Sequence, residues 1–457
     1  MSKEKREIKI AYIGGGSIGW ARSLMSDLAL CPQLTGCLAL YDIDLPAAEE
    51  NVRRAEMIFS HKDAKTAFKT EACADLDSAL RGADFIVISI QPGPISLFAS
   101  DLDIPARYGL PQTVGDSTGP GGISRALRAI PIYEDFAHRI MQICPNAWVI
   151  NYTNPMTLCT ATLYAAEPKI KAFGCCHEVF GAQTMLAELV EERGLAEECK
   201  RQEIELDISG VNHFTWATSA RWNGQDLFPI YREKISREGF FSDQTTLAQE
   251  RKAKARWFAS SGLVAADLFR RFGALACAGD RHLAEFVPWY LSSETELHRW
   301  GVVLTPSSYR VERERDGRSA KARSEKVEAV WPSGEEGVEQ MVALLGLGDL
   351  ESNCNLPNAG QTPDLARGGV VESYVTFSRD RVTPRTSKRL PTGARELVRR
   401  IMSVQQMVLE AGLKRDKDLA FQAFLADPLM RLPTDTAARL FDEMLAACRA
   451  FLPGWKL

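Results

Sequence analysis

The sequence predicts an α/β protein in which a doubly wound parallel sheet is followed by a mixed α+β domain. Three observations lead to this fold class: a glycine-rich turn directly after the first expected strand, strand patterns that alternate with helix patterns, and nearly continuous apolar runs. Alternating strands and helices form parallel sheets, whose strands are buried on both faces. Because 457 residues exceed what one hydrophobic core normally serves, we expect two domains, 1–185 and 186–457.

The elements of the first domain are predicted in order along the chain. Residues 7–13 alternate and are rich in β-branched side chains, as strands are, whereas residues 20–30 have helical spacing. Ligands of such sheets bind at the carboxyl ends of the strands. Further strands are expected over residues 37–41, 66–72, 83–90, 147–152 and 170–173, and helices over residues 77–81 and 123–128.

The turn after the first strand matches the pattern G-x-G-x-x-G at Gly14, Gly16 and Gly19. This order of strand, tight turn and helix predicts a Rossmann-like dinucleotide site, with Gly14, Gly16, Ser17 and Ile18 close to the pyrophosphate. The next strand ends at Asp42, whose carboxylate can accept hydrogen bonds from the adenosine ribose hydroxyls. Since a carboxylate would repel an additional 2′-phosphate, the pattern favours NAD. Asn151, at a later strand end, is a further candidate cofactor residue.

Composition argues against several classes of function. A net charge of −4 disfavours a nucleic-acid partner, because phosphate backbones require clustered excess Lys and Arg. The one basic run, residues 310–326, is mixed with acidic residues and is interpreted as a solvated loop or hairpin. We find no apolar run of roughly 18 residues and no signal-peptide pattern, so no membrane contact is expected. The eleven irregularly spaced Cys residues indicate reduced thiols and a cytoplasmic protein.

Candidate chemistry gathers at the strand end formed by Cys176, His177 and Glu178. A thiolate and an imidazole are good ligands for a late first-row divalent metal, although a buried Cys pair with an incidental surface His gives the same pattern. His213 lies among aromatic residues in an expected strand over residues 208–216, where a lone His is usually a core residue. Residues 279–286 add Asp280, Arg281, His282 and Glu285 before an aromatic stretch. A nucleotide domain with a sparse Cys/His site suggests redox chemistry on a polyol or hydroxy acid.

Seven short segments, in this order, resemble glycoside hydrolase family 4, the NAD- and divalent-metal-dependent glycosidases. The resemblance implies hydride transfer from sugar C3 to NAD, loss of the C2 proton, elimination of the aglycone, addition of water and return of the hydride to C3. Cys-His-Glu-Val at 176–179 is similar to the version found in α-galacturonidases. The segments are residues 14–17, 116–122, 154–155, 176–179, 210–213, 279–282 and 355–361.

The same resemblance implies roles for individual residues. Cys176 and His213 match the two metal ligands, with Mn²⁺ the usual ion, and Asn154 matches the residue that holds the sugar beside the metal. His177 occupies the position of the general acid that protonates the leaving oxygen in α-specific members. Glu178 is expected to face the substrate, with a role that the sequence leaves open.

The base that removes the C2 proton falls, by the same resemblance, in the segment from Asp267 to Tyr290. Asp280 is favoured, with Asp267 and Tyr290 as alternatives. His282 and Arg281 are candidates to pair with a carboxylate of the substrate.

One departure from the family pattern bears on the substrate. Relatives that act on phosphorylated sugars carry an Arg where this chain has Phe98, so a glycoside or oligouronide without phosphate is expected. An α-galacturonide is favoured, and α-glucuronidase or α-galactosidase activity remains open within the family. Outside the family, an NAD-dependent sugar or 2-hydroxyacid dehydrogenase and a non-catalytic NAD sensor remain open. Relatives are commonly dimers or tetramers, which implies a homodimer or homotetramer.

The last third of the chain predicts an α+β domain that covers the site. Residues 353–369 are rich in Asn, Pro and Gly and predict an ordered loop, and residues 370–377 predict a strand. Residues 394–411 and 437–451 have helical periodicity with apolar stripes, which are usually core-facing.

Overall fold

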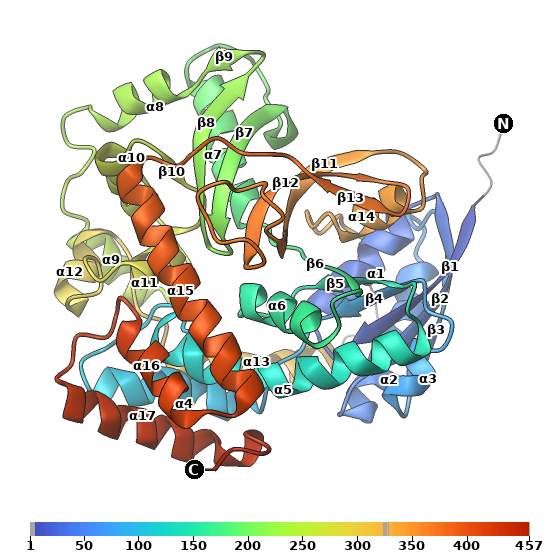
Figure 1. Ribbon diagram of the computed structural model, residues 1–457. Helices are drawn as coiled ribbons and strands as arrows, with labels where there is room; N and C mark the ends of the chain where they lie inside the picture. Colours follow the sequence, from blue (N-terminus) through green and yellow to red (C-terminus); the bar gives the residue numbers. More distant parts are fainter. Residues whose placement is uncertain (1–4, 323–326, 328, 457) are drawn as a thin grey trace.

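A computed structural model of the protein describes residues 5–322, 327 and 329–456, without the side chains of residues 317–322. Its centre is one mixed sheet with the strand order β10-β8-β7-β12-β11-β6-β5-β4-β1-β2-β3, and helices cover both faces (Figure 1). The two additional strands β9 and β13 pair with β8 and β12. The α/β class predicted from the sequence is confirmed.

The parallel half of the sheet has the strand order 3-2-1-4-5-6, which is the order of doubly wound dinucleotide-binding folds. Its core strands are apolar throughout because helices pack on both sides of them. The strands are β1 (Arg6–Ile13), β2 (Leu34–Tyr41), β3 (Phe68–Cys73), β4 (Phe85–Ile88), β5 (Trp148–Asn151) and β6 (Lys171–Gly174). The helices are α1 (Trp20–Leu30), α2 (Leu45–Phe59), α3 (Leu76–Leu80), α4 (Ile95–Arg107), α5 (Gly119–Ile143), α6 (Met156–Ala166) and α7 (Glu178–Glu192).

The antiparallel half continues the same sheet from the edge of β6. Asn355 pairs with Gly174, and Glu372 pairs with Gly210, so the hairpin of β7 and β8 is joined to the nucleotide-binding half through two intervening strands. The predicted division at residue 185 therefore separates two parts of one sheet. The strands are β7 (Ile204–Val211), β8 (Phe214–Trp222), β9 (Gln225–Asp226), β10 (Leu275–Ala276), β11 (Leu350–Pro357), β12 (Val370–Ser378) and β13 (Arg381–Pro384).

The remaining helices surround this half and the base of the molecule. α15 and α17 confirm the helices predicted over residues 394–411 and 437–451, and they pack with α4, α5 and α16 around a shared apolar core (Figure 1). The helices are α8 (Phe228–Ile235), α9 (Thr245–Ala253), α10 (Leu263–Phe272), α11 (Asp280–Phe286), α12 (Glu294–Arg299), α13 (Ser307–Ala322), α14 (Gly337–Leu344), α15 (Thr392–Lys414), α16 (Lys417–Ala426) and α17 (Thr434–Cys448).

Three predicted elements differ from the structure. The strand expected over residues 208–216 is two strands with a tight turn at Asn212 and His213, and His213 has a positive φ of 64°. The first part of the loop expected over residues 353–369 is strand β11, because its polar side chains are buried and paired within the sheet. The loop or hairpin expected over residues 310–326 is helix α13 up to Ala322, and residues 323–326 lie outside the described part.

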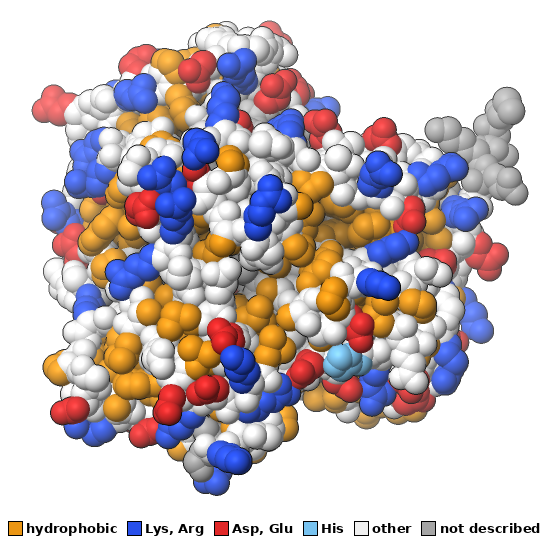
Figure 2. All heavy atoms as spheres, in the orientation of Figure 1, with side chains coloured by type: hydrophobic (Ala, Val, Ile, Leu, Met, Phe, Trp, Pro, Cys, Tyr) orange, Lys and Arg blue, Asp and Glu red, His pale blue; other side chains and the backbone are white. Residues whose placement is uncertain are grey.

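Charged side chains of both signs alternate over the face of the molecule drawn in Figure 2. This mixture gives that face no broad region of one charge, in keeping with the small net charge of −4. Among the described helices, none combines the length and apolar character needed to cross a membrane.

The turn after β1 provides a first test of the fold. A Cβ atom on Gly14 would lie 2.0 Å from the carbonyl oxygen of Ser89, at a φ of +96°, whereas a Cβ on Gly19 would meet nothing within 4 Å. We expect Gly14→Ala to lower the free energy of unfolding by about 2–5 kcal/mol, from backbone strain and overlap. Gly19→Ala should change it by less than about 0.5 kcal/mol. Urea denaturation of both variants measures this, and equal stabilities would contradict the packing described here.

Candidate active site at the strand ends

Three polar side chains from distant parts of the chain converge at the carboxyl edge of the sheet. Asp116, His213 and His282 each offer a ligand atom, and these atoms all lie within 4.8 Å of one another. Asp116 comes from the loop before α5, His213 from the turn between β7 and β8, and His282 from α11. One carboxylate and two imidazoles at this separation form a candidate site for a divalent metal such as Mn²⁺ or Zn²⁺.

Hydrogen bonds and ring contacts hold this cluster in place. The ring of His213 lies 3.9 Å from that of His282, measured between centroids, and its Nδ1 is 2.9 Å from Oγ of Ser117. Ser117 Oγ also donates to Oδ1 of Asp116 at 2.7 Å, and Nδ2 of Asn154 donates to Oδ2 at 3.2 Å. The structure therefore brings three sequence-predicted residues, His213, His282 and Asn154, together around Asp116.

Burial sets the charge of the cluster. Burial lowers the pKa of His213 to about 3, and the charge of His282 adds to this effect. Burial also lowers the pKa of His282 to about 4, and the charge of Arg281 adds to that effect. Burial alone would raise the pKa of Asp116, but His282, His213 and Arg125 together lower it to about 2. At neutral pH the cluster thus presents one carboxylate and two imidazoles with free lone pairs, the protonation state that a metal ligand requires.

The loop from Cys176 to Glu178 lies beside this cluster. Burial raises the pKa of the Cys176 thiol well above its usual value, and Glu372 and Glu178 raise it further. The carbonyl oxygen of Cys176 accepts a hydrogen bond from Nδ2 of Asn353 at 3.1 Å, which fixes the loop to β11. A nearby divalent cation would favour the thiolate, since coordination removes the thiol proton.

His177 and Glu178 point to different partners. Nδ1 of His177 is 2.8 Å from Oε1 of Glu335, and this hydrogen bond raises the pKa of the imidazole although burial opposes it. Oε2 of Glu178 accepts a hydrogen bond from the backbone N–H of Gly279 at 2.7 Å, and Oε1 is 3.7 Å from Nε2 of His282. Glu178 thus connects α7 to the segment that carries His282, a contact that the sequence pattern gave no means to foresee.

The glycine-rich turn has the geometry of a dinucleotide site. The backbone N–H of Gly16 donates to Oδ2 of Asp42 at 2.9 Å, so the loop and the acidic strand end are directly joined. Gly19 directly precedes α1 and has no side chain to cap the helix. Ser17 accepts a hydrogen bond from the N–H of Trp20 at 3.2 Å, and Ile18 lies half-buried between them. Backbone N–H groups at such a helix start bind anions.

Asn151 forms hydrogen bonds within the protein at the end of β5, and its contact with the cofactor stays a prediction. Its Oδ1 accepts hydrogen bonds from Tyr133 Oη at 2.6 Å and from the N–H of Thr153 at 3.0 Å, and its Nδ2 donates to the carbonyl oxygen of Thr153. The side chain is fully buried. The side-chain amide of Asn151 therefore stabilises the backbone that follows β5.

The carboxylate of Asp280 is bonded to the start of helix α10. Its buried carboxylate accepts hydrogen bonds from the backbone N–H groups of Leu263, Val264 and Ala265 at 3.0–3.1 Å, which are the first residues of α10. This is the contact that a helix-capping carboxylate makes. The role of Asp280 as the C2 base stays a prediction, and in this structure its oxygens are directed to the start of α10.

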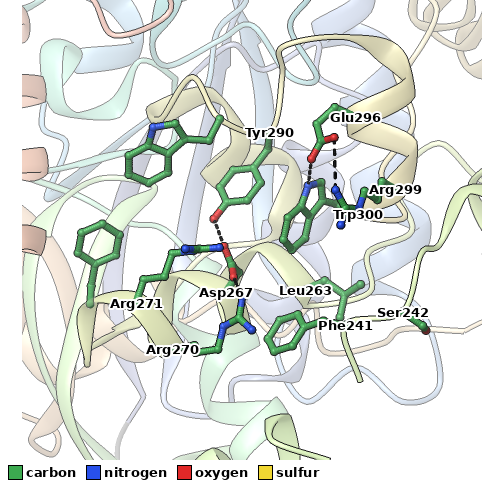
Figure 3. A pocket seen from close by; sticks show the side chains of 12 residues that line it. Phe241, Ser242, Leu263, Asp267, Arg270, Arg271, Tyr290, Glu296, Arg299 and Trp300 are labelled. Carbon is green, nitrogen blue, oxygen red and sulfur yellow. Dashed lines mark hydrogen bonds and ion pairs between the residues drawn. The ribbon is translucent and has the colours of Figure 1, made fainter. Parts of the chain in front are cut away.

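The alternative bases Asp267 and Tyr290 lie in a separate pocket of about 690 Å³ (Figure 3). Asp267 is bonded to Arg270, Arg271 and the Tyr290 hydroxyl, as the dashed lines in the figure show. None of the residues that line this pocket belongs to the cluster of Asp116, His213 and His282. Their position gives no support to a role at the metal cluster.

Two family models match the chain. The family 4 glycosyl hydrolase model matches residues 9–192, and the family 4 glycosyl hydrolase C-terminal domain model matches residues 208–430. The chain belongs to glycosyl hydrolase family 4. This family 4 protein is 46% identical to the α-galacturonidase of Thermoanaerobacterium saccharolyticum, over 99% of this chain and 98% of the relative. It is 45% identical to the α-galacturonidase of Bacillus subtilis, over 96% and 97% of the two chains.

Solved structures agree with this assignment. The structure of lplD from Bacillus subtilis has a TM-score of 0.88 at 44% sequence identity, covering 96% of this chain and 100% of that one. The 6-phospho-β-glucosidase of Thermotoga maritima, solved with manganese, NAD⁺ and glucose-6-phosphate, shares the fold with a TM-score of 0.76 at 20% identity, over 97% and 99% of the chains. The family predicted from the sequence segments is confirmed.

Removal of one member of the cluster tests it as a metal site. We expect His282→Ala to weaken Mn²⁺ binding about 10- to 100-fold or more. Loss of a residue that only hydrogen-bonds to a metal ligand already has an effect of this size, and loss of the ligand itself should have at least as large an effect. His138→Ala, an exposed His paired with Glu167, is the matched control and should bind Mn²⁺ as the wild type does. Titration of Mn²⁺ followed by the electron paramagnetic resonance of the free ion measures both. Unchanged affinity in His282→Ala would contradict the assignment.

The role of Asp280 can be tested in the same way. As a helix cap, Asp280→Asn should lower the free energy of unfolding by about 1–2 kcal/mol and leave kcat within about tenfold of the wild type. Asp416→Asn, which caps α16 through the N–H of Leu419, is the same substitution outside the site. Loss of a general base would instead reduce kcat about 10²- to 10⁴-fold with unchanged stability. Thermal unfolding and steady-state kinetics separate these two results.

Proposed function

We propose that this family 4 protein is an α-galacturonidase that requires NAD and a divalent metal, and that it releases galacturonic acid from α-galacturonides. The observation that carries the proposal is identity of 45–46% to curated α-galacturonidases along nearly the whole chain. Identity to the α-galactosidase of Bacillus subtilis is 28% over a similar length. Phe98, in place of the Arg of phosphosugar-specific relatives, supports a substrate without phosphate.

The nucleotide-binding residues fit NAD. Gly14 and Gly16 leave no room for a Cβ atom, so the loop lies directly against the neighbouring backbone. The N–H of Trp20 donates to Oγ of Ser17, and the other N–H groups of the first turn of α1 would bind the pyrophosphate. Asp42 holds the loop and retains lone pairs for the ribose hydroxyls. When bound, NAD supplies the hydride acceptor for the sugar C3 carbon.

The metal-binding residues also fit. Asp116, His213 and His282 offer ligand atoms around one point, and the Cys176 thiol lies on the adjoining loop. Among the described residues, Oδ1 of Asn154 and the side-chain amide of Asn212 are buried without a hydrogen-bond partner, which is costly unless a ligand or water completes them. When bound, the metal supplies Lewis-acid polarisation of the substrate oxygens.

Within this proposal, His177 donates the proton to the leaving glycosidic oxygen. The carboxylate of Glu335 favours the protonated imidazole and fixes its orientation through Nδ1, which leaves Nε2 as the donor. Asn154 would bond the sugar hydroxyls through its unpartnered oxygen. Glu178 would keep the segment bearing His282 in position.

One experiment distinguishes this function from a dehydrogenase. The reduced protein is incubated with NAD⁺, Mn²⁺ and an aryl α-galacturonide in deuterated water, with the matching α-glucuronide and α-galactoside as comparison substrates. We expect release of galacturonic acid that carries deuterium at C2, with no net formation of NADH. Net NADH without cleavage would support a sugar or hydroxyacid dehydrogenase instead. Faster cleavage of the glucuronide or galactoside would instead assign the activity to α-glucuronidase or α-galactosidase.

That the protein is a homodimer or homotetramer, and that it lies in the cytoplasm, remain predictions.

A further inference from the structure

Two arginines from different helices converge on a single backbone oxygen beside the metal cluster. Nη2 of Arg281, on α11, donates to the carbonyl oxygen of Thr113, and Nη2 of Arg310, on α13, lies 3.5 Å from the same oxygen. Arg281 also donates to Oγ1 of Thr305 at 2.8 Å. Two like charges are therefore held side by side, an arrangement that is unfavourable without a counter-charge.

The carboxyl groups near this pair are bonded to other groups. Among the described residues, neither Arg281 nor Arg310 forms an ion pair, and Nε of each is buried without a hydrogen-bond partner. Glu285 accepts hydrogen bonds from the backbone N–H groups of Val114 and Gly115, and the carboxylate of Asp116, which acts on both arginines through space, accepts hydrogen bonds from Ser117 and Asn154. Buried donors and unpaired cations of this kind are costly in a folded protein unless an anion binds them.

The aromatic surroundings orient the two guanidinium groups. Arg310 lies over the ring of Phe98 at 5.0 Å, and Arg281 lies over the ring of Phe258 at 4.8 Å. Phe98 is the residue that stands where phosphosugar-specific relatives carry an Arg. Phe98 lies on α4, so this chain has no Arg at that position. The guanidinium of Arg310, on α13, lies against Phe98 instead.

Arg310 is also close to the candidate site. Burial lowers the pKa of its guanidinium, and the charges of Asp116 and then Glu285 are near enough to oppose that effect. Arg281 directly precedes His282 on α11. An anion held by both arginines would thus lie next to the sugar that Asp116, His213 and His282 serve.

We infer that Arg281 and Arg310 form a carboxylate-binding site that holds the C6 carboxylate of a uronic acid. The inference rests on the proposed function and names the residues that select a uronide over a neutral sugar. A carboxylate has two oxygens, and a planar guanidinium offers paired N–H donors of matching spacing. A hydroxymethyl group at C6 would leave both cations unbalanced.

The test compares Arg310→Gln with Arg315→Gln, the same change further along α13 at an exposed Arg that pairs with Asp316. Each is assayed with an aryl α-galacturonide and the aryl α-galactoside that differs from it only at C6. We expect Arg310→Gln to raise KM for the galacturonide about 10- to 100-fold, as loss of a charge-assisted hydrogen bond does, and to leave KM for the galactoside unchanged. Arg310→Lys should recover part of the loss, and Arg315→Gln should match the wild type.

A binding measurement separates failure of this inference from failure of the proposed function. Galacturonic acid and galactose are titrated by calorimetry into each protein with NAD⁺ and Mn²⁺ present. If the wild type cleaves no galacturonide but binds galacturonic acid through Arg310, the proposed function fails and the carboxylate site stands. If Arg310→Gln and Arg315→Gln bind galacturonic acid equally, or if Arg310→Gln loses both sugars alike, the carboxylate site is overturned. Thermal unfolding of both variants checks that the fold is retained.

Discussion

The buried carboxyl group of Glu372 joins the parts of the protein that form the site. One oxygen accepts hydrogen bonds from Nδ2 of Asn353 and Asn355 on β11, and the other accepts one from Oγ1 of Thr215 on β8. The same Asn353 amide donates to the carbonyl oxygen of Cys176. A single side chain in the middle of the sheet thus fixes the loop after β6 relative to the hairpin that carries His213. A shift of β11 or β12 relative to the other would break several of these hydrogen bonds at once.

Local patterns predicted the nucleotide-binding half well. The turn at Gly14 depends on residues that are adjacent in sequence, and its neighbours Gly16 and Asp42 are separated by one helix and one strand of regular pattern. Each of these positions is determined by the conformation of nearby residues, so a single sequence contains the pattern that predicts it. The same reasoning placed Asn154 and Cys176 just after buried strands, where the structure has them after β5 and β6.

The remainder of the site could not be predicted because it depends on contacts between distant segments. Asp116 lies in a loop rich in small residues, and only the fold brings it to His213 and His282. Asp280 is in a plausible sequence position for a base, but its carboxylate accepts hydrogen bonds from three backbone N–H groups more than a dozen residues earlier. The turn at His213 was hidden because Asn212 and His213 lack the glycine that usually marks a tight hairpin. The sequence around Glu335 contains no pattern that predicts its contact with His177.

The continuity of the sheet has a consequence for how the chain can be divided. Val338, Met341, Val375 and Phe377 from the C-terminal half belong to the same apolar core as Ile10, Tyr12 and Phe85 of the nucleotide-binding half. A fragment ending near residue 185 would lose one face of that core and leave the edge of β6 open to pairing with other chains. The two halves of the chain are therefore poor candidates for exchange as separate modules between relatives.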